Sequence, residues 1–105
     1  MKLECRQERI ARYQPMYFGV DYYPEQWVFP YGGSVDDPEA QWQEDADLMV
    51  KAGVNVVRMG DFTWGLCEPE DGKFDFEWLK RAMDVLGRAG IKTVLATPTA
   101  APPLW

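Results

Sequence analysis

A unit of 38 residues that occurs twice constrains the fold of this chain more than any other feature. Three short runs rich in apolar and β-branched residues alternate with two segments of helical periodicity. The runs span residues 16–23, 54–59 and 92–96. Equivalent positions in successive runs, Gly19, Val57 and Leu95, are spaced at 38 residues. Strands that alternate with helices form right-handed βαβ units in a parallel sheet, so the sequence predicts an α/β fold in the order β-α-β-α-β.

Two segments between these runs have the apolar spacing of amphipathic helices. For the first helix, Asp37 is the expected amino-terminal cap, Pro38 suits the first helical position, and Gly53 is expected to end the helix. For the second helix, Asp75 and Gly90 have the corresponding roles. Both predicted helices therefore have start and stop signals of their own.

The lengths of the connections favour one arrangement of these units. Both links from strand to helix are long and both links from helix to strand are short. A (β/α)8 barrel has this asymmetry because its functional loops follow the carboxyl ends of the strands. A doubly wound sheet also fits the alternation, but no strand runs into a glycine-rich nucleotide-binding turn. Since eight strands need about 250 residues, we predict an incomplete barrel, its first βαβαβ portion, over residues 15–105, preceded by an irregular arm at residues 1–14.

Composition excludes several classes of function. The chain carries a net charge of −6, which argues against binding to nucleic acid. It contains no histidine, which excludes Ser-His-Asp sites and His-containing metal sites. Its two cysteines, Cys5 and Cys67, are too far apart for a CxxC pair and indicate a reduced, cytoplasmic chain without a bound metal. No leader segment and no apolar run long enough to span a membrane is recognised.

Charged residues that follow the predicted strands are the candidates for chemistry. Asp21 and Glu25 follow the first strand, and Arg58 and Asp61 follow the second. Two carboxylates at neighbouring strand ends can form a glycosidase pair, but they can equally anchor loops, and Asp61 can pair with Arg58. An arginine fork at a strand end can hold a substrate hydroxyl or orient a carboxylate. Trp64 can line a sugar site or pack beneath its loop.

Four motifs occur in order along the chain: GVDYYPEQW at 19–27, AGVNVVRMGDFTW at 52–64, EPEDGKFDF at 68–76 and TPTAAPPLW at 97–105. Together they resemble the opening of a glycoside hydrolase family 42 β-galactosidase. The resemblance implies a (β/α)8 catalytic domain and retaining hydrolysis of terminal β-galactosides, with no cofactor. It also implies a general acid/base glutamate after the fourth strand and a nucleophilic glutamate after the seventh, so neither is expected within three strands.

The resemblance assigns some of the candidate residues and leaves others without a role. Arg58 matches the family's arginine at the end of the second strand, which helps to form the galactose subsite. Asp61 stands where the family often has glutamate, a longer acid. Asp61 and Trp64 are expected to line the active site. Cys5 and Cys67 do not match the family's zinc-binding cysteines.

Three functions stay open at this point. The first is an N-terminal segment of a β-galactosidase that acts on a β-galactoside once the barrel is complete. The second is a non-catalytic fragment that associates with itself or with the rest of the barrel, since a three-stranded parallel sheet has two open edges. The third is another retaining barrel glycosidase, such as a β-glucosidase or a mannanase.

Overall fold

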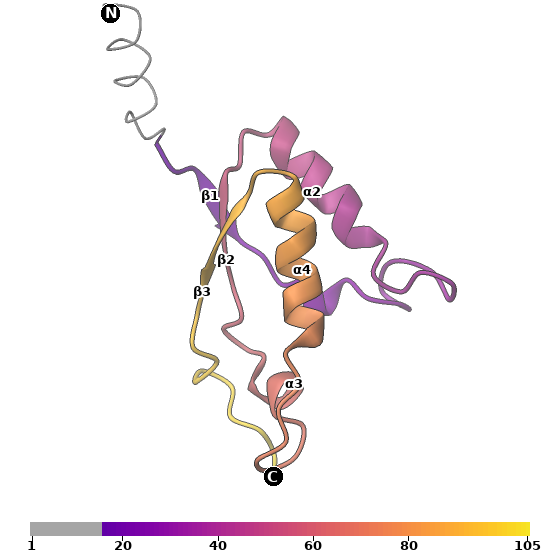
Figure 1. Cartoon of the computed structure of the whole chain (residues 1–105), viewed down its shortest axis with the longest axis vertical. Coiled ribbons are helices and arrows are strands. Elements are labelled where there is room, and N and C mark those ends of the chain that lie inside the picture. Colours follow the sequence, from indigo (N-terminus) through magenta and orange to yellow (C-terminus); the bar gives the residue numbers. More distant parts are fainter. Residues whose placement is uncertain (1–15) are drawn as a thin grey trace, which may run out of the picture.

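Three parallel strands form one sheet, as the repeated unit predicts. The computed structural model describes residues 16–105, so the expected arm at residues 1–14 lies outside the described residues. Along the chain, the elements are β1 (Gly19–Asp21), η1 (Pro24–Gln26), α2 (Gln41–Lys51), β2 (Val56–Met59), α3 (Trp64–Cys67), α4 (Glu77–Arg88) and β3 (Lys92–Leu95). The strand order is β1-β2-β3, which places β2 in the centre (Figure 1).

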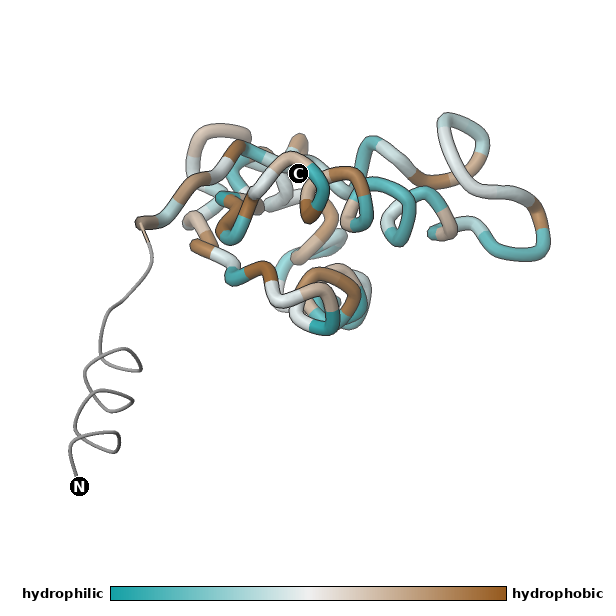
Figure 2. The backbone as a smooth tube through the Cα atoms, turned by 90° about the horizontal axis from the view of Figure 1, so that it is seen from above, coloured by the Kyte–Doolittle hydropathy of each residue, from teal (hydrophilic) through white to brown (hydrophobic). Residues whose placement is uncertain are grey.

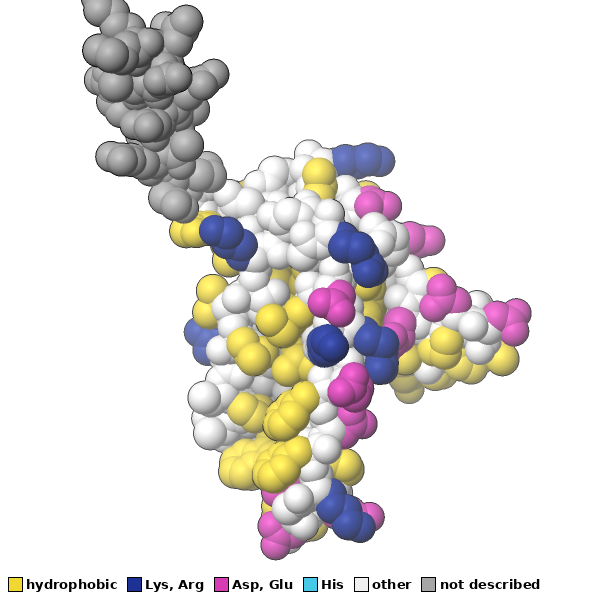
Figure 3. Space-filling model, in the orientation of Figure 1, with side chains coloured by type: hydrophobic (Ala, Val, Ile, Leu, Met, Phe, Trp, Pro, Cys, Tyr) yellow, Lys and Arg dark blue, Asp and Glu magenta, His cyan; other side chains and the backbone are white. Residues whose placement is uncertain are grey.

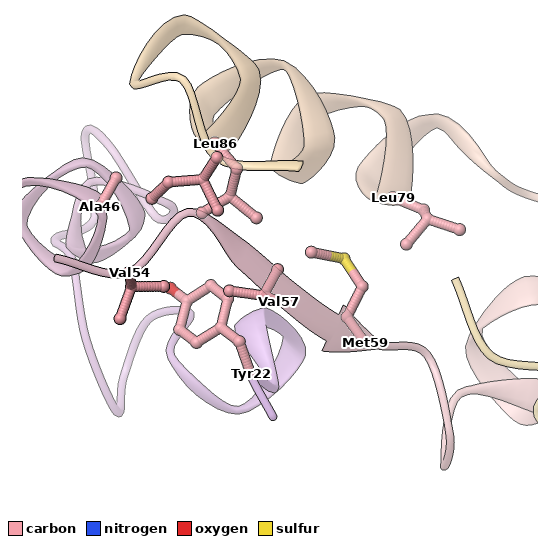
Figure 4. Packing of buried hydrophobic residues seen from close by; sticks show 8 residues of the cluster. Tyr22, Ala46, Val54, Val57, Met59, Leu79 and Leu86 are labelled. Carbon is pink, nitrogen blue, oxygen red and sulfur yellow. The ribbon is translucent and has the colours of Figure 1, made fainter. Parts of the chain in front are cut away.

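The helices α2 and α4 lie side by side and cover the same face of the sheet (Figure 1). Val57 and Met59 of β2 are fully buried beneath them. Figure 4 shows both side chains on the side of the strand that faces Leu79 and Leu86 of α4. Hydrophobic and hydrophilic residues alternate along the backbone, as expected for elements with one packed side (Figure 2).

The opposite face of the sheet is open in the described part of the chain. Strand pairing aligns Asp21, Arg58 and Val94 in one row across the three strands. Paired residues of parallel strands point to the same face, so this row lies opposite the helices. Arg58 and Val94 are exposed. Both helices pack on one side of β2, so within the described residues only that side of the strand is covered.

The helix ends confirm the stop signals and correct both starts. Gly53 and Gly90 both have left-handed backbone conformations, with φ of 87° and 79°. The cap position of α4 is Phe76, so the expected cap at Asp75 is one residue too early, although Asp75 Oδ1 accepts a hydrogen bond from the Glu77 N–H. The expected start of the first helix at Asp37 and Pro38 is wrong, because α2 begins at Gln41. The main-chain bonds just before it join residues three apart, which makes that turn tighter than an α-helix.

Hydrogen bonds to α2 hold the segment that follows the short strand β1. The Tyr22 hydroxyl donates to Asp45 Oδ2 at 2.7 Å, and Trp42 Nε1 donates to the Pro24 carbonyl at 2.8 Å. Burial raises the pKa of the Tyr22 hydroxyl, and the Asp45 carboxylate raises it further. These contacts fix the path of the chain as it leaves the carboxyl end of β1. Within residues 16–105, no helix is long and apolar enough to cross a membrane.

Candidate functional site

The carboxyl end of β2 brings Arg58 and Asp61 together. Asp61 Oδ1 accepts hydrogen bonds from Arg58 Nε at 3.1 Å and from Arg58 Nη2 at 2.8 Å. The Arg58 side chain is 59% exposed, whereas that of Asp61 is only 16% exposed. The hydrogen bond to Asp61 raises the pKa of the Arg58 guanidinium, and the charge of Asp21 adds to this effect. Asp61 therefore orients the guanidinium while much of it stays open to solvent, and the predicted pairing of the two residues is confirmed.

A shallow depression lies beside Arg58 on the open face of the sheet. Its lining comes from all three strands and includes Asp21, Val56 and Val94. The lining combines the charged residues Asp21 and Arg58 with valines, which suits a ligand that has hydroxyl groups and an apolar ring face. Asp21, predicted from its place after the first strand, is thus part of the same surface as Arg58.

Glu25 lies in the loop after β1, and its carboxylate is enclosed. Neither of its oxygens has a hydrogen-bond partner in the described chain. Burial raises the pKa of the Glu25 carboxyl, and the negative charge of Asp61 raises it as well. The charge of Asp61 therefore acts on Glu25, whereas among residues 16–105 the side-chain hydrogen bonds of Asp61 come from Arg58.

An aromatic pair joins the loops that follow β1 and β2. The rings of Tyr23 and Phe62 are tilted by 46°, with their centroids 5.7 Å apart. Desolvation raises the pKa of the Tyr23 hydroxyl, and the negative charges of Asp21 and Asp61 raise it further. Sequence reasoning missed Tyr23, because a tyrosine between an apolar strand and a proline carries no signal that distinguishes site from core.

Trp64 begins the short helix α3 and is held by a different acid. Its Nε1 donates to Glu68 Oε1 at 2.9 Å, and the other oxygen of Glu68 accepts from the Gly72 N–H at 2.8 Å. Within residues 16–105, no hydrogen bond joins Trp64 to Arg58 or Asp61. The structure therefore brings two of the three predicted site residues together and places Trp64 in a separate hydrogen-bonded group. Sequence reasoning gave Glu68 no role of its own, although it opens the motif at 68–76 and lies four residues after Trp64.

The described residues contain no group of three or more acidic, cysteine or histidine side chains that could hold a metal ion. Cys67 is buried, with its Sγ 3.6 Å from Thr63 Oγ1. A buried free cysteine of this kind packs as a small apolar side chain.

The parallel sheet, the helices on one face and the polar groups at the carboxyl strand ends define part of a (β/α)8 barrel. A family model described as "Beta-galactosidase" matches residues 21–105. The chain therefore belongs to glycoside hydrolase family 42.

Relatives of known sequence agree with this assignment. The chain is 50% identical over 90 residues to the β-galactosidase BbgII of Bifidobacterium bifidum, which covers 86% of the chain and 12% of the relative. It is 47% identical over 87 residues to the β-galactosidase BgaA of Thermus sp., which covers 83% of the chain and 12% of the relative. The chain thus spans about one eighth of the length of these relatives.

Solved structures agree on the fold. The β-galactosidase from Rahnella sp. R3 superposes with a TM-score of 0.74 at 35% identity, over 90% of the chain and 13% of that protein. The enzyme from Halorubrum lacusprofundi gives 0.72 at 46% identity, over 86% of the chain and 12% of that protein. The predicted βαβαβ portion of a barrel is confirmed.

Proposed function

We propose that the chain supplies part of the active-site wall of a retaining β-galactosidase, with residues 15–105 as the N-terminal segment of the catalytic barrel. In this proposal Arg58 binds hydroxyl groups of a β-galactoside, and Asp61 and Trp64 line the site. The position of Arg58 carries the proposal. It is an exposed guanidinium at the carboxyl end of a barrel strand, on the face away from the helices, and barrel enzymes have their active sites at this end.

The chemistry of retaining hydrolysis divides the work between this chain and the rest of the barrel. One glutamate attacks the anomeric carbon, while a second protonates the leaving oxygen and then activates water. The resemblance places both glutamates beyond the third strand, so this chain contributes binding rather than the reacting carboxylates. Asp61 accepts two hydrogen bonds from Arg58, which leaves the exposed donors of the guanidinium to meet sugar oxygens.

A chimera tests the proposal. The full chain replaces the matching segment of the Thermus β-galactosidase BgaA, and hydrolysis of a chromogenic β-galactoside is measured. We expect the chimera to be active and the chain alone to be inactive. Turnover by the chain alone that follows it through purification, and that is lost in Glu25→Gln or Asp61→Asn, would contradict the proposal and return catalysis to the local carboxylates.

Exposed apolar side chains favour a second candidate, in which the chain associates with itself. Between α4 and β3, a groove lined by Phe76, Met83 and Leu95 is open. Figure 3 shows hydrophobic side chains gathered over this region. Among the described residues, more large apolar side chains are exposed than buried, which is unusual for a stable monomer.

Sedimentation at several concentrations tests this second candidate. We expect the weight-average mass of the chain to rise with concentration. Leu95→Lys should weaken the association more than Leu48→Lys, because Leu48 is also exposed but lies on α2, away from the groove. A monomer at every concentration would remove the second candidate.

A further inference from the structure

We propose that Glu68 is a positioning residue, which sets the orientation of Trp64 so that its ring face can pack against a sugar. The inference deepens the proposed function and rests on it. It concerns a residue that touches neither Arg58 nor the reacting atoms, and that acts through the tryptophan it holds. Four hydrogen bonds join Glu68 to Trp64, Gly72 and Trp105.

The Glu68 carboxylate is enclosed, and each of its two oxygens accepts a hydrogen bond. The residue is only 8% exposed, although it belongs to an acidic turn at the protein surface. One oxygen accepts from Trp64 Nε1 at 2.9 Å and the other from the Gly72 N–H at 2.8 Å. A buried carboxylate with a donor on each oxygen is held in one orientation, and it holds its donors in return. The indole of Trp64 is therefore fixed at its polar edge.

The main chain of Glu68 adds two further contacts. Its N–H donates to the Trp64 carbonyl at 2.8 Å, so the same two residues are joined twice. Its carbonyl accepts from Trp105 Nε1 at 3.0 Å. Trp105 lies in the segment after β3, so Glu68 links the segments that follow two neighbouring strands. Both tryptophans use their indole N–H groups on Glu68, while Trp64 is half-buried and Trp105 is exposed.

The neighbouring acid Glu70 shows that this arrangement is specific. Glu70 lies two residues further along the same turn, but its side chain is 67% exposed and pairs with Lys73 at the surface. Glu68 and Glu70 can therefore be changed in the same way, from carboxylate to amide, with different expected results. Pyranose rings have apolar faces that pack on indole, so a galactoside is the ligand class that a fixed Trp64 would contact.

The first measurement follows the indole N–H signals of the full chain labelled with nitrogen-15. Trp64→Phe identifies the Trp64 signal by its loss. In Glu68→Gln the amide can accept at only one of the two positions, so we expect the Trp64 signal to shift and its hydrogen exchange to accelerate. Glu70→Gln should leave that signal unchanged. An unchanged Trp64 signal in Glu68→Gln would overturn the proposal.

The second measurement uses the chimera and separates positioning from a merely structural role. We expect Glu68→Gln to raise KM about tenfold with little change in kcat, the size expected for one lost hydrogen bond to a charged group. Trp64→Phe should raise KM by a similar factor. The KM of the double variant should equal that of Trp64→Phe, because both changes disrupt the same contact between Glu68 and Trp64. Kinetics of Glu68→Gln equal to those of Glu70→Gln, or additive effects in the double variant, would overturn the inference alone. A wild-type chimera without activity would instead overturn the proposed function and this inference with it.

Discussion

Replacing Arg58 by alanine should strongly lower the kcat/KM of the chimera but change its melting temperature only slightly. If the guanidinium donates to galactose hydroxyls, Arg58→Ala leaves those polar groups unpaired in the transition state. The expected loss is about ten- to hundredfold in kcat/KM. The assay is steady-state hydrolysis of a chromogenic β-galactoside, combined with a thermal melt of the same preparation.

The structure explains why stability should change little. The pair between Arg58 and Asp61 is largely exposed on the arginine side, and exposed ion pairs contribute little because solvent and salt screen them. A matched control exists in Arg81, which donates to Glu39 through Nε at 2.8 Å and through Nη2 at 3.0 Å. Arg81 is similarly exposed but lies on α4, outside the candidate site. Arg58→Ala and Arg81→Ala should therefore lower the melting temperature by similar amounts, and only Arg58→Ala should lower activity.

One pattern of results would refute this reasoning. A melting temperature clearly lower in Arg58→Ala than in Arg81→Ala, with unchanged kcat/KM, would make Arg58 a structural residue. Arg58→Lys refines the test because lysine keeps the charge but lacks the planar fork. We expect an intermediate loss of activity in this variant. Activity of Arg58→Lys as low as that of Arg58→Ala would show that the fork matters more than the charge.

Three further predictions concern the folded state and are measured by chemical denaturation. Gly90→Ala should lower the free energy of unfolding by about 1–2 kcal/mol, because alanine is strained at φ 79°. Gly87→Ala within α4 should raise it by about 0.5–1 kcal/mol, and equal effects of the two changes would contradict the role of the left-handed turn. Tyr22→Phe should lower the free energy of unfolding by about 1.5–3 kcal/mol, because it removes a hydrogen bond to the Asp45 carboxylate. The control Tyr31→Phe, at an exposed position, should leave it almost unchanged. Glu25→Gln should remove a pH-dependent loss of stability. Burial raises the pKa of the Glu25 carboxyl in the folded state above its unfolded value near 4.5. The contribution of Glu25 to the free energy of unfolding is therefore fully present below the unfolded pKa and is lost as pH rises through the folded pKa. Wild type and Glu25→Gln with the same pH dependence would disprove this.

The repeated unit predicts the order and direction of the strands because hydrophobic periodicity and helix stop signals are local properties. Gly53 and Gly90 end their helices where expected, since each helix needs a left-handed residue there. The start of α2 could not be predicted as well. Asp37 and Pro38 satisfy the usual rules, but Ala40 N–H bonds to the Asp37 carbonyl three residues back, so a tighter turn replaces the first helical turn.

The candidate site is predictable only where its residues are close in sequence. Arg58 and Asp61 are three residues apart, and their pairing could be weighed from spacing alone. The enclosure of the Glu25 carboxylate depends on how the loop after β1 packs, which no local pattern reports. Glu68 and Glu70 look equivalent in the sequence, yet one is buried and holds a tryptophan while the other is exposed. Tertiary packing decides between them.

The row formed by Asp21, Arg58 and Val94 argues for a role of the open face beyond packing. A core face would not carry a guanidinium, because burying a charge without full pairing is costly. A purely solvent-facing surface would have no reason to align an arginine with an exposed valine in the next strand. A face that mixes a fixed charge with apolar side chains at the carboxyl end of parallel strands is instead what a barrel needs where its interior meets its active site. Asp61 strengthens this argument, because it accepts from Nε and Nη2 of Arg58 through a single oxygen and leaves the other N–H donors of the exposed guanidinium for a ligand.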